Sequence, residues 1–98
     1  MAAVVNVLHF KESPDPALFE RAAEELGPLM REVAGFNGLH VVRTGDSEIV
    51  LIIFADSTEI LDDIATTIGS PWMMEHVVPL LASPPARHLG DVIASATR

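Results

Sequence analysis

The chain has 98 residues, of which 14 are acidic and six are basic, with a formal net charge of −8 and no cysteine. The lack of cysteine excludes disulfides, thiolate nucleophiles and cysteine-ligated metal centres, and the scattered basic residues disfavour binding to a nucleic-acid backbone. The longest apolar run, 49–55, is too short for a membrane span of roughly 20 residues, and no signal peptide is evident, so we expect one cytoplasmic domain over 1–98 without a membrane partner.

The first predicted element is a strand over residues 3–11, and it is mainly apolar on both faces. Alternation of side chains defines the two faces. One face carries Val4, Asn6, Leu8 and Phe10, and the other carries Val5, Val7, His9 and Lys11. Asp15 as N-cap and Pro16 at the first helical position then open an amphipathic helix that Gly35 ends.

The second half of the chain predicts a hairpin followed by helices and a last strand. Strands over 36–44 and 48–55 are joined by a Gly-Asp-Ser turn, and the second of them has no polar face. Asp56 with Glu59 resembles a capping box for a helix that closes at Gly69. Ser70 and Pro71 predict a fresh helix start for 72–81, and the final strand is expected over 86–94.

This order of elements predicts an α+β fold of the ferredoxin-like, split βαβ type, in which two helices cover one face of a four-stranded antiparallel sheet. The other sheet face would remain apolar and uncovered. A large exposed apolar face is unusual for a monomer. We therefore expect a homodimer joined through the sheet face, with coverage of that face by residues 72–81 as the alternative.

Several short motifs carry a resemblance to a known family. They are Asn6, Gly35-Phe36, the segment 54–59 (Phe-Ala-Asp-Ser-Thr-Glu), Ser70-Pro71 and the segment 89–92 (Leu-Gly-Asp-Val). With these motifs the chain resembles the dimeric α/β-barrel superfamily, and within it the antibiotic-biosynthesis-monooxygenase-like family. The resemblance implies a homodimer with a pocket between helices and sheet in each subunit. It also implies use of molecular oxygen on electron-rich aromatics, quinone precursors or haem, with no flavin and no dedicated metal.

Asn6 is the sharpest candidate for chemistry, since a carboxamide in an apolar strand must find hydrogen-bond partners. In relatives an asparagine at this strand position binds the oxygenated ligand, which implies a catalytic role for Asn6. The alternative is that Asn6 bonds neighbouring backbone or lies at the dimer contact.

Trp72 and His76 lie four residues apart, so they share one helix face. The hypothesis is that Trp72 stacks on a substrate and His76 relays a proton, and the alternative is that Trp72 is a packing anchor beside a surface histidine. Leu8, Phe10 and Met73 are expected to bind substrate as apolar pocket wall. The remaining histidines fit no metal motif, so we expect no metal site.

Three functions follow as hypotheses. The first is a cofactor-independent monooxygenase acting on a small apolar aromatic or polyketide-like substrate. The alternative is a non-catalytic dimeric barrel that binds an apolar small molecule. The third is a haem-degrading monooxygenase, for which the chain offers Thr66 and Thr67 where those relatives carry a tryptophan.

Overall fold

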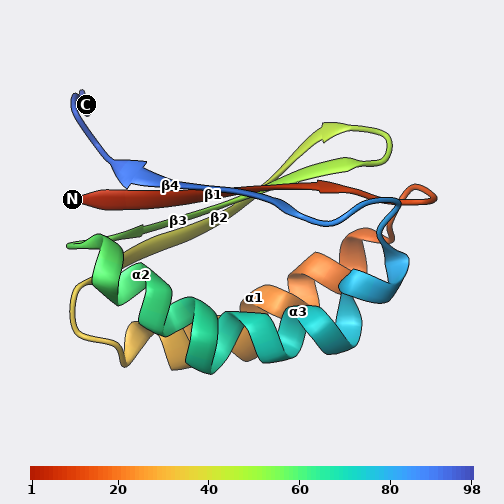
Figure 1. Ribbon diagram of the computed structural model, residues 1–98, viewed down its shortest axis with the longest axis horizontal. Coiled ribbons are helices and arrows are strands. Elements are labelled where there is room, and N and C mark those ends of the chain that lie inside the picture. Colours follow the sequence, from red (N-terminus) through yellow and green to blue (C-terminus); the bar gives the residue numbers. More distant parts are fainter.

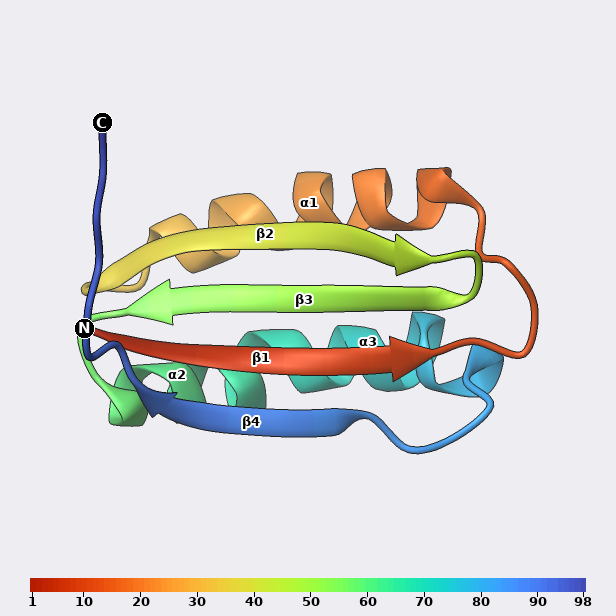
Figure 2. The same ribbon diagram turned by 90° about the horizontal axis from the view of Figure 1, so that it is seen from above.

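A computed structural model describes residues 1–98 and shows one layer of helices packed on one sheet (Figure 1). The elements in chain order are β1 (Ala2–His9), α1 (Pro16–Arg31), β2 (Phe36–Gly45), β3 (Glu48–Ala55), α2 (Thr58–Ile64), the π-helical segment η1 (Ala65–Gly69), α3 (Ser70–His76), the 3₁₀ turn η2 (Val78–Leu80) and β4 (Ala86–Asp91). The strand order is β2-β3-β1-β4, and every neighbouring pair is antiparallel (Figure 2). This arrangement confirms the predicted α+β, ferredoxin-like fold.

The face of the sheet that meets the helices holds the core. Alternation in β1 places Ala2, Val4 and Leu8 on this face, and all three side chains are buried. They pack against apolar residues of α1 and α2 in two neighbouring clusters. The face predicted for Val4, Asn6, Leu8 and Phe10 is therefore the covered one.

The opposite face of the sheet has no helix on it, because α1, α2 and α3 all lie on the same side (Figure 1). Paired strands form rows of side chains across this open face. One row has Ile52 and Val5 at its centre and ends in His40 and His88 on the outer strands. Val42 on the same face is 43% exposed. The alternative in which residues 72–81 cover this face is thus wrong.

The helical run after β3 differs from the prediction at both of its expected boundaries. Ser57, not Asp56, is the N-cap, and its hydroxyl oxygen accepts a hydrogen bond from the Ile60 amide at 3.3 Å. Gly69 does not end the helix, because it adopts right-handed helical angles (φ −72°, ψ −52°). The backbone continues through a π-helical segment into α3, so Ser70 sits inside the run and caps nothing.

Helix α1 begins where predicted, whereas the last strand, β4, is shorter than predicted. Asp15 caps α1 by accepting a hydrogen bond from the Ala17 amide at 2.9 Å. β4 ends at Asp91 and not at Ala94, and its neighbour Val92 donates to the Met1 carbonyl at 2.9 Å. None of the helices has the length and apolar character needed to cross a membrane.

Candidate functional site

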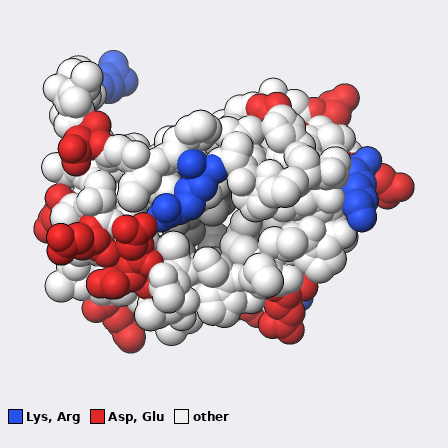
Figure 3. All heavy atoms as spheres, viewed as in Figure 1, with Lys and Arg blue, Asp and Glu red and all other residues white.

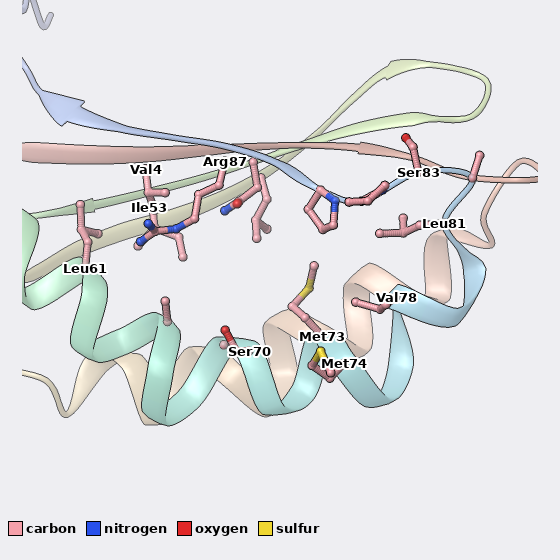
Figure 4. Close-up of a pocket in the computed structure, with 17 residues that line it drawn as sticks. Val4, Ile53, Leu61, Ser70, Met73, Met74, Val78, Leu81, Ser83 and Arg87 are labelled. Atoms are coloured by element: carbon pink, nitrogen blue, oxygen red, sulfur yellow. The ribbon is translucent and has the colours of Figure 1, made fainter.

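A cavity of about 600 Å³ lies between the sheet and the run of helices from α2 to η2. Figure 4 shows its wall: Val4 and Ile53 come from the sheet, Leu61 from α2, and Met73 from α3, where the thioether reaches toward the strands. The segment between η2 and β4 closes the remaining side with Leu81 and residues 82–85. Most of this wall is apolar, which suits a flat hydrophobic ligand.

The Asn6 carboxamide is the polar group that the cavity leaves without a protein partner. The side chain lies on the covered face of β1 and lines the cavity. It takes part in none of the side-chain hydrogen bonds of the chain. Every fully buried polar side-chain atom in the chain has a hydrogen-bond partner. The Asn6 amide has no such partner, so its polar atoms are accessible to solvent. The amide is therefore free to bond a ligand, and the alternative in which it bonds neighbouring backbone is wrong.

Arg87 on β4 contributes the single charged side chain of the cavity wall. It pairs with Asn6 across the β1/β4 ladder, so the two side chains stand next to each other on the covered face. One guanidinium nitrogen, Nη2, donates to Asp62 Oδ1 of α2 at 2.9 Å. Figure 3 shows a basic group at the rim of a hollow, with the largest acidic cluster at the left end of the view and smaller acidic groups elsewhere on this face.

The π-helical segment η1 widens the helical run where it passes the cavity. Its first and last residues, Ala65 and Gly69, both line the wall and carry little or no side chain. A π-helical turn frequently marks a functional site, because it displaces the residues that follow it. A Cβ added at Gly69 would meet the Ile64 carbonyl oxygen at 3.8 Å, so an alanine there would narrow the cavity without a clash.

Trp72 and His76 do share one helix face, but that face meets α1 and not the cavity. Their ring centroids are 4.6 Å apart with a 40° tilt, and neither residue lines the cavity. The Trp72 indole Nε1 donates to Glu25 Oε2 of α1. Hydrogen bonds from Trp72 and then from Arg21 hold the pKa of Glu25 below its usual value. The pair therefore connects α3 to α1.

Of the other three predicted substrate-binding residues, one lines the cavity and two do not. Met73 lines the cavity. Leu8 and Phe10 do not, because their side chains are buried in the second core cluster, where Phe10 meets Phe19 edge to face at 5.8 Å. Of the six predicted site residues, the structure brings Asn6 and Met73 together in the cavity and places the others outside it.

Arg87 is a residue that the sequence analysis missed. Its one visible signal is strand alternation, which puts Arg87 on the same face as Leu89 in the last strand. That pattern does not reveal which face of the strand turns toward the helices. Elsewhere, no group of three histidine, aspartate or glutamate side chains is placed to hold a metal ion.

Comparisons with known proteins show the fold and leave the reaction open. No protein-family model matches the chain, and no curated protein matches it. Solved structures described as antibiotic biosynthesis monooxygenases, one of them as putative, share its fold, which confirms the fold expected from the resemblance. The chain therefore has the ferredoxin-like fold of that class of proteins.

Three solved structures, of proteins with different descriptions, illustrate the likeness in fold. NE2512 of Nitrosomonas europaea, a protein of unknown function, is 20% identical over 99% of this chain and 93% of its own, with a TM-score of 0.79. The ActVA-Orf6 monooxygenase of Streptomyces coelicolor, in complex with nanaomycin D, is 19% identical over 99% and 91%, with a TM-score of 0.77. SnoaB of Streptomyces nogalater, a cofactor-independent oxygenase, is 16% identical over 99% and 97%, with a TM-score of 0.72.

Proposed function

We propose that this protein is a cofactor-independent monooxygenase that binds a small, flat, aromatic or polyketide-like substrate in the cavity. The observation that carries the proposal is the free carboxamide of Asn6 in an otherwise apolar wall. Solvent reaches this amide, so a ligand that enters the cavity would replace water as its hydrogen-bond partner. The fold is shared with an oxygenase that is cofactor-independent and with a monooxygenase that binds nanaomycin D.

The proposed reaction draws its electrons from the substrate. An activated CH₂ group loses both hydrogens, one atom of O₂ becomes the new carbonyl oxygen, and the other leaves as water. The slow step needs the substrate as its electron-rich enolate or phenolate. The Asn6 amide donates a hydrogen bond to that developing oxyanion, and its position in a largely apolar cavity strengthens the interaction.

The proton lost by the substrate passes to water in this scheme. No carboxylate or imidazole lines the cavity, because His76 faces α1. The rate is therefore expected to follow ionisation of the substrate itself and to rise with pH through the substrate's own pKa. A rate that instead follows a protein histidine near pH 6.5 would point to another proton acceptor.

Oxygen consumption with 1,8-dihydroxyanthrone, corrected for its spontaneous oxidation, tests the assignment. Asn6→Leu is expected to lower the enzyme-dependent rate about 100-fold, which is the typical effect of losing one oxyanion donor. Asn37→Ala is the matched control, because Asn37 bonds Asp56 Oδ1 outside the cavity. We expect this control and His76→Ala to keep the wild-type rate. An Asn6→Leu variant as fast as the wild type would remove Asn6 from the reaction.

A non-catalytic barrel that binds an apolar small molecule is the second candidate. The lack of an acid or base in the cavity wall favours it. The same experiment separates the two candidates: a binding protein holds the anthrone without accelerating oxygen uptake.

Haem degradation has less support, because no histidine lines the cavity to bind iron. Titration with haemin is expected to leave the Soret band at the position of free haemin.

The proposal includes a homodimer joined through the open face of the sheet. The centre of that open face carries partly exposed apolar side chains, which are Val5, Val7, Val50, Ile52 and Phe54. A stable dimer needs about 800 Å² of buried surface from each partner, and a four-stranded apolar face is of that order. Sedimentation as a dimer at low micromolar concentration is the expected result.

A further inference from the structure

We propose that the ligand of the cavity is an organic acid, and that its carboxylate binds Arg87 in exchange for Asp62. The inference deepens the proposed function, since it rests on ligand binding in the same cavity. It specifies the substrate class as a flat apolar body with one acidic group.

Arg87 has more hydrogen-bond donors than the protein uses. A guanidinium has five N–H donors in a fork that matches a carboxylate. In this chain the side chain makes one hydrogen bond, from Nη2 to Asp62 Oδ1. The remaining donors have no protein partner, although the residue lines a cavity with apolar walls. A guanidinium with free donors in such a place fits an anionic ligand better than a neutral one.

Asn6 is the neighbour of Arg87 on the sheet. Asn6 stands beside it in the β1/β4 ladder, on the same face, and its amide is also free. One side chain supplies charge and the other an uncharged N–H donor. Two adjacent donors of this kind are able to bond the two oxygens of one carboxylate, or a carboxylate and a neighbouring phenolate.

Asp62 forms an exposed ion pair with Arg87. Its side chain is 58% exposed and that of Arg87 is 39% exposed, so this ion pair lies at the solvent-facing edge of the cavity. Exposed ion pairs contribute little to stability, and water readily takes the place of the partner. Asp62 thus neutralises part of the Arg87 charge and competes only weakly with an entering acid.

The overall charge makes this arrangement selective. The chain carries a formal charge of −8, so most of its surface repels an anion. Arg87 is the one basic side chain on the cavity wall. An acid that reaches the cavity is therefore held by a specific contact and not by a general basic surface.

A pair of isosteric probes tests the inference without turnover. Anthracene-2-carboxylate and anthracene-2-carboxamide differ in charge and share their ring system, and binding is followed by their fluorescence. The wild type is expected to bind the acid about 10- to 100-fold more tightly than the amide, as charge-assisted hydrogen bonds typically allow. Arg87→Met should abolish that ratio and leave amide binding within about twofold, while Arg87→Lys should keep part of it because the charge remains without the fork.

Two further variants test the competition by Asp62 and control for the loss of a positive charge. Loss of the competing carboxylate in Asp62→Asn should tighten acid binding a few-fold and leave amide binding unchanged. Arg31→Met removes the same charge from an exposed helix position outside the cavity, and it should keep the wild-type ratio. Raised salt should lower acid affinity in the wild type more than in Arg87→Met.

The outcomes separate this inference from the proposed function. Equal affinity of the wild type for acid and amide, or an unchanged ratio in Arg87→Met, overturns the acid preference and leaves the cavity as an apolar binding site. Binding of neither probe by the wild type overturns the binding site and the acid preference with it. Acid-selective binding, together with no acceleration of oxygen uptake by either 1,8-dihydroxyanthrone or an anthrone that carries a carboxylate, overturns the monooxygenase and supports this inference.

Discussion

The two faces of the sheet carry similar apolar side chains, but they differ in what meets them. The covered face packs against three helices and still leaves a cavity of about 600 Å³, with Asn6 and Arg87 side by side on its wall. The open face has no covering element and no cavity residue, and its polar side chains include His40 and His88 on the outer strands and the His9–Glu48 pair at one end of the central strands. In the functions proposed above, the covered face binds the ligand and the open face forms the dimer interface.

The largest expected effect comes from charging the open face. Ile52→Glu places a carboxylate in the centre of that face, where a partner sheet would bury it. Burial of an unpaired charge costs several kcal/mol, so the dimer dissociation constant should rise about 1,000-fold or more. Sedimentation equilibrium measures the change, with Ile52→Val as the conservative control. A variant that sediments like the wild type would show that this face is not the interface.

A smaller effect is expected from shortening a core side chain of the covered face. Leu8 is 1% exposed and lies in the core beside the cavity. Leu8→Ala should lower the free energy of unfolding by about 2–5 kcal/mol, as large-to-small core changes do. Chemical denaturation measures this loss. Affinity for anthracene-2-carboxylate, measured well below the melting temperature, should stay within about twofold, and a large loss of affinity would restore Leu8 as a ligand contact.

Asn6→Leu is expected to change stability in the opposite direction. The carboxamide forms no hydrogen bond within the protein and lies among apolar side chains, so a leucine of similar size should stabilise the fold by about 1 kcal/mol. Thermal denaturation measures the shift, and Asn37→Leu on the exposed surface is the control. A marked destabilisation by Asn6→Leu would indicate a structural role for the amide.

The smallest effect concerns the contact between α3 and α1. Trp72→Phe removes the hydrogen bond to Glu25. Since the pKa of Glu25 is lowered in the folded state, its contribution is present above the usual glutamate pKa of about 4.3 and is lost as the pH falls through the lowered value. The wild type and Trp72→Phe should therefore converge in stability as the pH falls below the lowered pKa of Glu25. A difference that persists there would reflect packing alone.

Sequence reasoning reached the fold because strand alternation and helical periodicity are local patterns. It failed at Gly69 and Ser70, where usual helix-ending and helix-starting residues are overridden by packing of a continuous helical run. It found Asn6, since a carboxamide in an apolar strand stands out in a sequence. It misplaced Trp72 and His76 because spacing fixes a shared face and not the direction of that face. It missed Arg87 because cross-strand neighbours are invisible before the strand order is known.

The most direct test of ligand binding at the covered face is the side-chain amide spectrum of the protein. The chain contains two asparagines, Asn6 and Asn37, and no glutamine, so a ¹H–¹⁵N spectrum has only two side-chain NH₂ pairs. Addition of anthracene-2-carboxylate is predicted to shift the Asn6 pair and to give nuclear Overhauser contacts from it to ring protons, while the Asn37 pair, outside the cavity, stays in place. An Asn6 pair that does not move while the probe binds elsewhere would contradict the account.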